Sequence, residues 1–570
     1  MGSRSAERIV LIGVGGVDWS SLRAVMRRGL APNISALVAR GGLGSLQHSG
    51  PRAGVAPWAT MATGHEPLVH GVFRESEAWA GGVRPTTRAS WQRPPVWATL
   101  AEAGVATASA GWPASAPGDS WAGQHVDESY AVASAPAWND WALPLHCASP
   151  PLREALRDLR IHPTDIGAAQ LLPLVPDLGT IDQARDSGLP ALAVGMARTA
   201  TIQAAALHLL GEPTWQAMFV HHRWMGEIRR ADTSSPPWDR VVDGAWRFFD
   251  GLIGQIAAMA GEDCTVIVAS PGAQRSTGIV IAAGPGVRPA SEIVNARLID
   301  LAPTVLGKFD LHDSTSPGRV IAGAGVTAGT RAAPAIVPAE TAGDVELAQM
   351  MALGYAPPPA PPTGWQVEGL LTRSVLLLAV DPAAAGKAAD DAIRLMPDLV
   401  EAIRMRARAH VLLNEAEPLP ALGDALLGLA PHRPWGSLIH GAAHAMRQDA
   451  AKARPWLEAA AASGDPETVL HVGAAWLMLS HAAEARLAFA AVLAGDPANA
   501  EAAVGLSVAA LSGNDLQGAE KPLRQVLARD PHAVPAWLQL ADVLQRGGRT
   551  HEATVARKNA ARFGGPAADL

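Results

Sequence analysis

The sequence is poor in cysteine and contains no long hydrophobic run: it has two cysteines in 570 residues, Cys147 and Cys264. Two thiols cannot build a disulfide framework or a cysteine-rich zinc site. The segment at residues 9–13 is too short for the core of a signal peptide, and no apolar stretch has the length of a membrane span. We therefore expect a cytoplasmic protein without a membrane span.

An excess of basic charge is also missing. Lysine and arginine number 46 against 53 aspartates and glutamates, which gives a net charge of −7. Without a basic stripe, nucleic acid is not an expected partner. Hydrophobic residues make up 48% of the chain and charged residues 17%, so a wholly disordered protein is excluded.

The first part of the chain has the pattern of an α/β domain. Short runs rich in β-branched residues at 9–12, 218–220, 265–268 and 279–281 predict buried parallel strands. Helical stretches at 34–39, 196–210 and 246–260 lie between them. This alternation predicts a doubly wound, mostly parallel sheet over residues 1–340.

A proline-rich segment separates this part from a helical one. Residues 341–364 include the sequence Tyr-Ala-Pro-Pro-Pro-Ala-Pro-Pro-Thr-Gly, which favours an extended linker. From residue 365 to 570 the chain is rich in alanine and leucine, and prolines end helical stretches at 397, 431, 466, 497 and 531. The spacing resembles that of tetratricopeptide repeats, whose period is about 34 residues. An ordinary helical bundle does not predict such a period.

A repeat array of this kind presents a concave groove, usually to a peptide or a protein. The resemblance therefore implies an unidentified protein or peptide partner in the groove. Self-association into a homo-oligomer is the alternative that the sequence leaves open.

Several segments of the first part occur in an order typical of one superfamily. They lie at residues 12–19, 31–37, 57–67, 70–71, 95–100, 111–117, 284–286, 298–306 and 318–319. Together they resemble the alkaline phosphatase superfamily, in particular the type I phosphodiesterase/nucleotide pyrophosphatase group, which includes members with C-terminal tetratricopeptide repeats. The resemblance implies two zinc-like ions about 4 Å apart that bind phosphoryl oxygens and activate a Thr or Ser nucleophile.

The sequence departs from this pattern at the nucleophile and at all six ligand positions. The replacements are Gly15 for the first aspartate, Gly54 for the nucleophile, Gly226 and Arg230 for an Asp–His pair, Ser270 and Pro271 for a second Asp–His pair, and Gln274 for the last histidine. Flanking motifs fix most of these positions, whereas only the preceding strand fixes Gly226 and Arg230. Without nucleophile and ligands we expect a non-catalytic domain that holds no metal.

Two further uses of this region remain open. Gly54 precedes an expected helix, and Arg230 and Arg275 could add positive charge, so the altered pocket could bind a phosphorylated ligand; a closed, empty pocket is the alternative. An active metal-dependent phosphodiesterase would need relocated ligands. The candidates are Asp18, Glu227, Asp263, His221 and His222.

The remaining candidates have plainer explanations. His221 and His222 follow a strand and should point to opposite faces, so they do not easily bind one ion. His65 and His70 are expected to hydrogen-bond locally around a Thr-Gly turn. The Gly-x-Gly-Gly sequence at residues 13–16 lacks the dinucleotide-binding spacing. Four tryptophans could line a pocket or belong to the core, namely Trp58, Trp97, Trp112 and Trp121.

Overall fold

The chain divides into two compact units: apart from residues 80–82, which are grouped with the second, the first ends at Pro359 and the second begins at Ala360. The computed structural model describes residues 7–48, 54–79, 82–118, 121–133, 141–181, 188–228, 238, 240–272, 277–334, 370–371, 373–375, 377–378, 381–429 and 432–562. The predicted linker, 341–364, lies outside these residues. The boundaries 1–340 and 365–570 therefore stay predictions.

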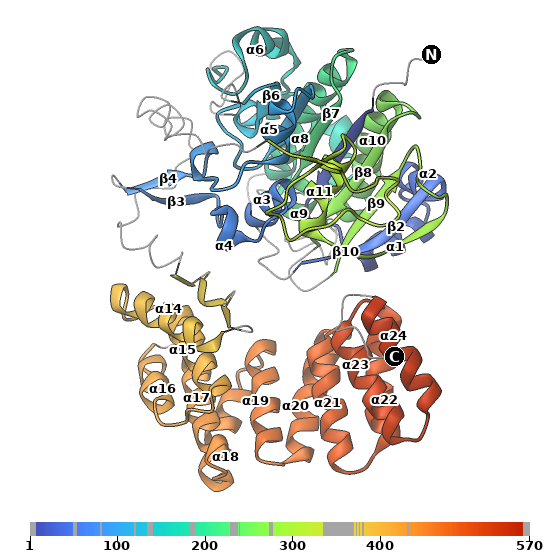
Figure 1. The fold of residues 1–570 in the computed structure, drawn as a ribbon. Helices are drawn as coiled ribbons and strands as arrows, with labels where there is room; N and C mark the ends of the chain where they lie inside the picture. Colours follow the sequence, from blue (N-terminus) through green and yellow to red (C-terminus); the bar gives the residue numbers. More distant parts are fainter. Residues whose placement is uncertain are drawn as a thin grey trace. The chain divides into compact units, whose positions relative to one another are not determined.

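The first unit is built on one eight-stranded sheet with the order β10-β2-β9-β8-β1-β7-β5-β6 (Figure 1). Only β9 runs antiparallel to its neighbours, β2 and β8. The strands are β1 (Ile9–Val14), β2 (Gly41–Gln47), β5 (Thr107–Trp112), β6 (Gln124–Asp127), β7 (Ala217–His222), β8 (Thr265–Ser270), β9 (Gly278–Ala283) and β10 (Ser291–Arg297). The predicted doubly wound, mostly parallel sheet is confirmed.

Helices cover both faces of this sheet. On β1, Val10 and Ile12 join the core beneath one set of helices, whereas Ile9 and Leu11 join the core beneath the other set. The first set is α1 (Trp19–Arg27), α2 (Pro32–Arg40), α8 (Gly188–Gly211) and α10 (Val241–Ala260). The second set is α3 (Ala56–Thr63), α5 (Val96–Glu102) and α11 (Leu301–Gly307). Since both faces are buried, the strands read as continuous apolar runs.

Shorter elements fill the connections of the first unit. They are α4 (Pro67–His70), β3 (Ser76–Trp79), β4 (Gly82–Pro85), α6 (Pro150–Leu156), α7 (Ala168–Leu171), α9 (Trp224–Ile228), β11 (Leu311–His312) and β12 (Arg331–Ala332). One of them, α9, follows β7 and contains the predicted site position Gly226.

A buried carboxylate from another helix caps the N-terminus of α2. Pro32 occupies the first turn, where its missing N–H costs nothing. The side chain of Asp250, on α10, accepts hydrogen bonds from the backbone N–H of Asn33 (3.1 Å) and of Ile34 (2.8 Å). The N-terminal backbone donors of α2 are thus bonded to a side chain on another helix.

The second unit is a row of antiparallel helices that follow one another in chain order (Figure 1). They are α14 (Pro382–Leu395), α15 (Val400–Leu412), α16 (Leu419–Leu427), α17 (Arg433–Met446), α18 (Ala450–Ala461), α19 (Pro466–Met478), α20 (Ala482–Gly495), α21 (Ala500–Ser512), α22 (Leu516–Arg529), α23 (Val534–Arg546) and α24 (Thr550–Arg562). The predicted helical repeat array is confirmed.

Small residues let these helices approach closely. A Cβ atom at Gly473 on α19 would lie 2.7 Å from the ring of Phe489 on α20, and one at Gly505 on α21 would lie 2.4 Å from it. Ala519 and Ala553, each the fourth residue of its helix (α22 and α24), are fully buried as well. Within the described ranges, none of the helices has both the length and the apolar character needed to cross a bilayer.

Candidate functional site

The predicted site positions lie at the carboxyl edge of the central strands. β1 pairs in parallel with β7 and with β8, and Gly13 is level with His221 on one side and Ala269 on the other. Gly15, Arg223 and Pro271 follow these three strands at the same edge. Ligands of open α/β sheets bind at such edges, so this is where a site is expected.

Two of the predicted ligand positions pack backbone against backbone. A Cβ atom at Gly15 would lie 3.1 Å from the carbonyl oxygen of Arg223. The next residue, Gly16, has φ +75°, and its Cβ would lie 2.4 Å from the Cα of Gly226 on α9. The turn after β1 and the first turn of α9 therefore leave little room for side chains between them.

Aromatic rings fill the space beside this contact. The indole of Trp58, on α3, lies against Gly13, where a Cβ atom would come within 2.8 Å of the ring. The ring centroids of Trp58 and His221 are 4.2 Å apart, and Trp112 lies edge-on to both. All three side chains are buried. This end of β1 and β7 is packed as core.

The two consecutive histidines of β7 occupy opposite faces of the sheet. The ring of His221 contacts Trp58, whereas the ring of His222 contacts Phe249 and its Nε2 lies 3.1 Å from the Oε1 of Gln203. Burial lowers the pKa of His222 to about 4 and holds that of His221 well below its usual value. Both rings are neutral at pH 7, and they face different helical layers.

Arg223, which sequence reasoning did not single out, is the charged centre of this edge. Its guanidinium nitrogens lie 3.0 Å from Glu75, 3.4 Å from Glu128 and 2.8 Å from Glu227. Burial lowers the pKa of Arg223, but the three carboxylates outweigh that effect and raise it. Burial also raises the pKa of Glu128, which Arg223 partly offsets. The three glutamates therefore compensate the charge of Arg223 and hold its side chain in place. Its position directly after a strand was the only signal in the sequence.

The other predicted positions are dispersed or bonded locally. Ser270 is buried, and its Oγ accepts a hydrogen bond of 3.2 Å from the backbone N–H of Gly272. Gly54 is exposed, has φ +76° and precedes α3. Arg230, Gln274 and Arg275 lie outside the described residues, so the predicted anion site around Gly54 stays a prediction.

The relocated ligands do not come together. Asp18 accepts a hydrogen bond of 2.8 Å from the backbone N–H of Ser21 and thereby caps α1. Asp263 is exposed before β8, at the sheet edge opposite to the one that follows His221. Glu227 is paired with Arg223.

The donors present do not fit the family's two-ion centre. Glycine and proline side chains offer no donor atom to a cation. Over the residues that the structure describes, no three histidine, cysteine, aspartate or glutamate side chains are grouped so as to hold a metal ion.

The tryptophans and the other histidines have structural roles. Trp97 is fully buried and packs against Trp91, Trp112 and Trp121, which agrees with a core rather than a pocket. The Nε2 of His70 lies 3.0 Å from the Oγ1 of Thr60.

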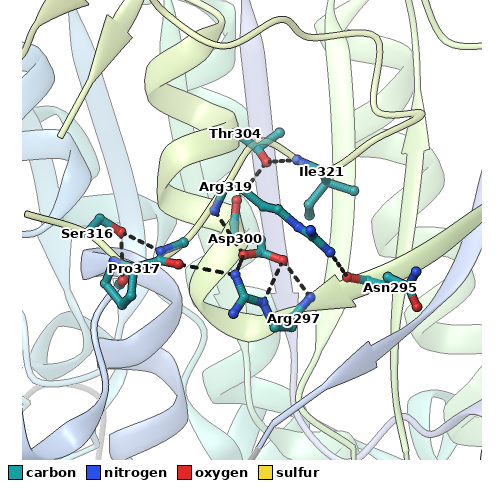
Figure 2. Close-up of polar contacts among 10 residues, drawn as sticks. Asn295, Arg297, Asp300, Thr304, Ser316, Pro317, Arg319 and Ile321 are labelled. Carbon is teal, nitrogen blue, oxygen red and sulfur yellow. Dashed lines mark hydrogen bonds and ion pairs between the residues drawn. The ribbon is translucent and has the colours of Figure 1, made fainter. Parts of the chain in front are cut away.

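A polar network holds the turn after α3 (Figure 2). Asp300 is buried and accepts hydrogen bonds from the side chain of Arg297 (2.8 Å) and the backbone N–H of Arg319 (3.0 Å). The hydroxyl of Ser316 donates to the carbonyl of Gly64 (2.8 Å), and that of Thr304 accepts from the N–H of Ile321. The motifs at residues 298–306 and 318–319 thus have a scaffolding role behind α3.

The comparison with known families bears on this domain. Residues 9–275 match the family described as type I phosphodiesterase / nucleotide pyrophosphatase. The match covers just under half of the chain, and over it the N-terminal domain is similar to that family. The match runs from β1 to the segment after β8, so it includes the edge described above. The predicted resemblance is confirmed: the chain contains a phosphodiesterase-like domain and, after it, a tetratricopeptide-like helical region.

Two solved structures are similar to parts of this chain. The phosphonate monoester hydrolase SpPMH from Silicibacter pomeroyi is 13% identical, with coverage of 57% of this chain and 78% of that one and a TM-score of 0.36. TTC0263, a tetratricopeptide repeat protein of Thermus thermophilus, is 20% identical, with coverage of 31% and 99% and a TM-score of 0.28. Neither likeness supports a further conclusion about the phosphodiesterase-like domain. No curated protein matches the chain significantly.

Proposed function

We propose that the phosphodiesterase-like domain is non-catalytic and that the chain acts by binding a protein or peptide at its helical repeats. The observation that carries the proposal is the contact between the turn after β1 and α9, where Gly15 and Gly16 pack against Arg223 and Gly226. Aspartate ligands are expected at Gly15 and Gly226, and the family's chemistry depends on the charge that such ligands hold in place.

The aromatic packing supports the same proposal. Trp58 lies on Gly13 and His221, so the space at the end of β1 contains an indole ring rather than polar groups. Arg223 supplies positive charge at this edge and is neutralised by three glutamates. These residues stabilise a closed edge and provide no activated nucleophile.

The experiment combines metal content with hydrolysis. The full chain, purified without chelator, is incubated with excess Zn²⁺ or Mn²⁺, desalted and measured by elemental mass spectrometry, and bis(p-nitrophenyl) phosphate is the substrate. We expect no retained ions and no hydrolysis above the rate of the metal alone; an active member of the family is the positive control. About two ions per chain together with hydrolysis would show an active enzyme with relocated ligands and refute the proposal.

A further inference from the structure

The odd-numbered helices of the repeat unit form one continuous layer. α17 packs against α15 and α19, and α21 packs against α19 and α23, in addition to the neighbours in sequence. In a curved array the helices of the inner layer are closest to one another, so α15, α17, α19, α21 and α23 line the concave side. Concave surfaces of this kind are where repeat proteins bind their partners.

A cation bridges three of these inner helices. The guanidinium of Arg404, on α15, lies 3.6 Å above the ring of Trp435, on α17, and 2.7 Å from the carboxylate of Glu467, on α19. His471 lies one turn after Glu467 and packs edge-on against Trp435, with 5.6 Å between the two ring centroids. The charge of Arg404 is therefore compensated within the layer.

Arg408 provides a second cation that is not compensated. It lies one turn after Arg404 on the same face of α15, is exposed, and has no ion pair among the residues described. Burial, followed by the charge of Arg408, lowers the pKa of His471 to about 4, so that ring is neutral at pH 7. Glu401 lies two turns away, about 10 Å along the axis. This end of the layer therefore has free positive charge beside the packed rings of Trp435 and His471.

Five of the six equivalent residues on three other inner helices, α19, α21 and α23, are aliphatic. Arg404 and Arg408 are the fifth and ninth residues of α15. The fifth residues of α19, α21 and α23 are Leu470, Val504 and Leu538, and the ninth residues are Ala474, Val508 and Asp542. Val508 and Leu538 are 36% and 38% exposed, which is high for large apolar side chains. Asp542 is paired with Arg546 at 3.1 Å. We call Arg408, Ala474, Val504, Val508 and Leu538 the inner strip.

We propose that the inner strip binds an extended peptide whose acidic side chain pairs with Arg408 and whose aliphatic side chains cover Val504, Val508 and Leu538. The proposal rests on the proposed function of the repeats and specifies the chemistry of the partner. Neighbouring helices pack about 8–10 Å apart, so the four steps from α15 to α23 span roughly 32–40 Å. At about 3.3 Å per residue, an extended segment of about 12 residues covers that length.

The probe is a phage-displayed library of random 12-residue peptides, selected on the full chain at physiological salt. Enriched peptides are synthesised, and their affinity is measured for the wild type, Arg408→Glu and Arg529→Glu. Arg529, an exposed arginine at the end of α22, is the matched control because α22 is outside the inner layer. Unchanged melting temperatures of both variants establish that they are folded.

We expect the enriched peptides to combine Asp or Glu with aliphatic residues. Arg408→Glu should weaken their binding about tenfold or more, Arg529→Glu should not, and a Glu→Lys peptide should regain affinity for Arg408→Glu. Peptides that bind but lack acidic residues, or that ignore Arg408→Glu, would overturn this inference and leave the proposed function standing. Failure of the repeats to select any peptide would contradict both.

Discussion

The close contact between the turn after β1 and α9 can be tested by adding one methyl group. In Gly16→Ala the new Cβ would lie 2.4 Å from the Cα of Gly226, a backbone atom that cannot move without shifting α9. The substitution also forces alanine into the left-handed region, since φ is +75°. Left-handed backbone costs about 1–2 kcal/mol, and overpacking adds about 1–3 kcal/mol.

Gly29→Ala is the matched control. Gly29 follows α1 with φ +69°, and nothing lies within 4 Å of its added Cβ, so it carries only the backbone cost of about 1–2 kcal/mol. Differential scanning calorimetry of the full chain measures both variants. For a domain of this size, 1 kcal/mol lowers Tm by about 2 °C, so Gly16→Ala should melt several degrees below Gly29→Ala. Equal melting temperatures would show that the backbones are not in contact, and the main support for the proposed function would fail.

Three further predictions concern buried polar groups. Asp250→Ala removes the acceptor of the first N–H groups of α2, so it should lower the free energy of unfolding by about 2–4 kcal/mol, with Asp250→Asn less affected, in urea titrations. Asp300→Ala leaves Arg297 and the backbone N–H of Arg319 without their acceptor and should cost about 3 kcal/mol or more; a loss below 1 kcal/mol in the same assay would contradict the network. His125 and His222 have pKa values near 4 because of burial. Between pH 6.5 and about 4 these histidines bind protons in the unfolded chain but not in the folded one. The free energy of unfolding should therefore fall as the pH is lowered through that window, by up to about 1.4 kcal/mol per pH unit for each histidine. A free energy of unfolding that does not change with pH in that window would contradict the burial of these histidines.

The sequence predicted the strands that are rich in β-branched residues, and it missed those that are not. β1, β7, β8 and β9 coincide with the predicted runs and extend them by one or more residues. β2 was not predicted, because its sequence is Gly-Gly-Leu-Gly-Ser-Leu-Gln. The glycines are required by packing: a Cβ at Gly41 would lie 2.1 Å from the carbonyl oxygen of Ala282, and one at Gly44 would lie 2.1 Å from that of Ile293. Only tertiary contacts distinguish such a strand from a loop.

The sequence indicated where in the fold the candidate site lies, but it did not predict which side chains contact one another there. The order of the motifs put Gly15 and Ser270 after two predicted strands, and the structure shows that these strands, β1 and β8, are neighbours, so that both residues lie at one edge of the sheet. The pairing of Arg223 with Glu75 and Glu128 joins residues far apart in the sequence, so no local pattern indicates it. The contact between the Trp58 ring and Gly13 depends on the angle at which α3 crosses the sheet, and the sequence does not specify that angle.

The glycine contact at the end of β1 also bears on how such a domain evolves. An aspartate placed at residue 15 would meet the backbone of Arg223 at its first side-chain atom, and it would do so before any second ligand existed to share a cation. The substitution Gly15→Asp alone would therefore press on that backbone with no bound ion to offset the cost. If the domain is non-catalytic, as proposed, a two-ion centre would require several substitutions together, and the one at residue 15 would also require the backbone of Arg223 to move.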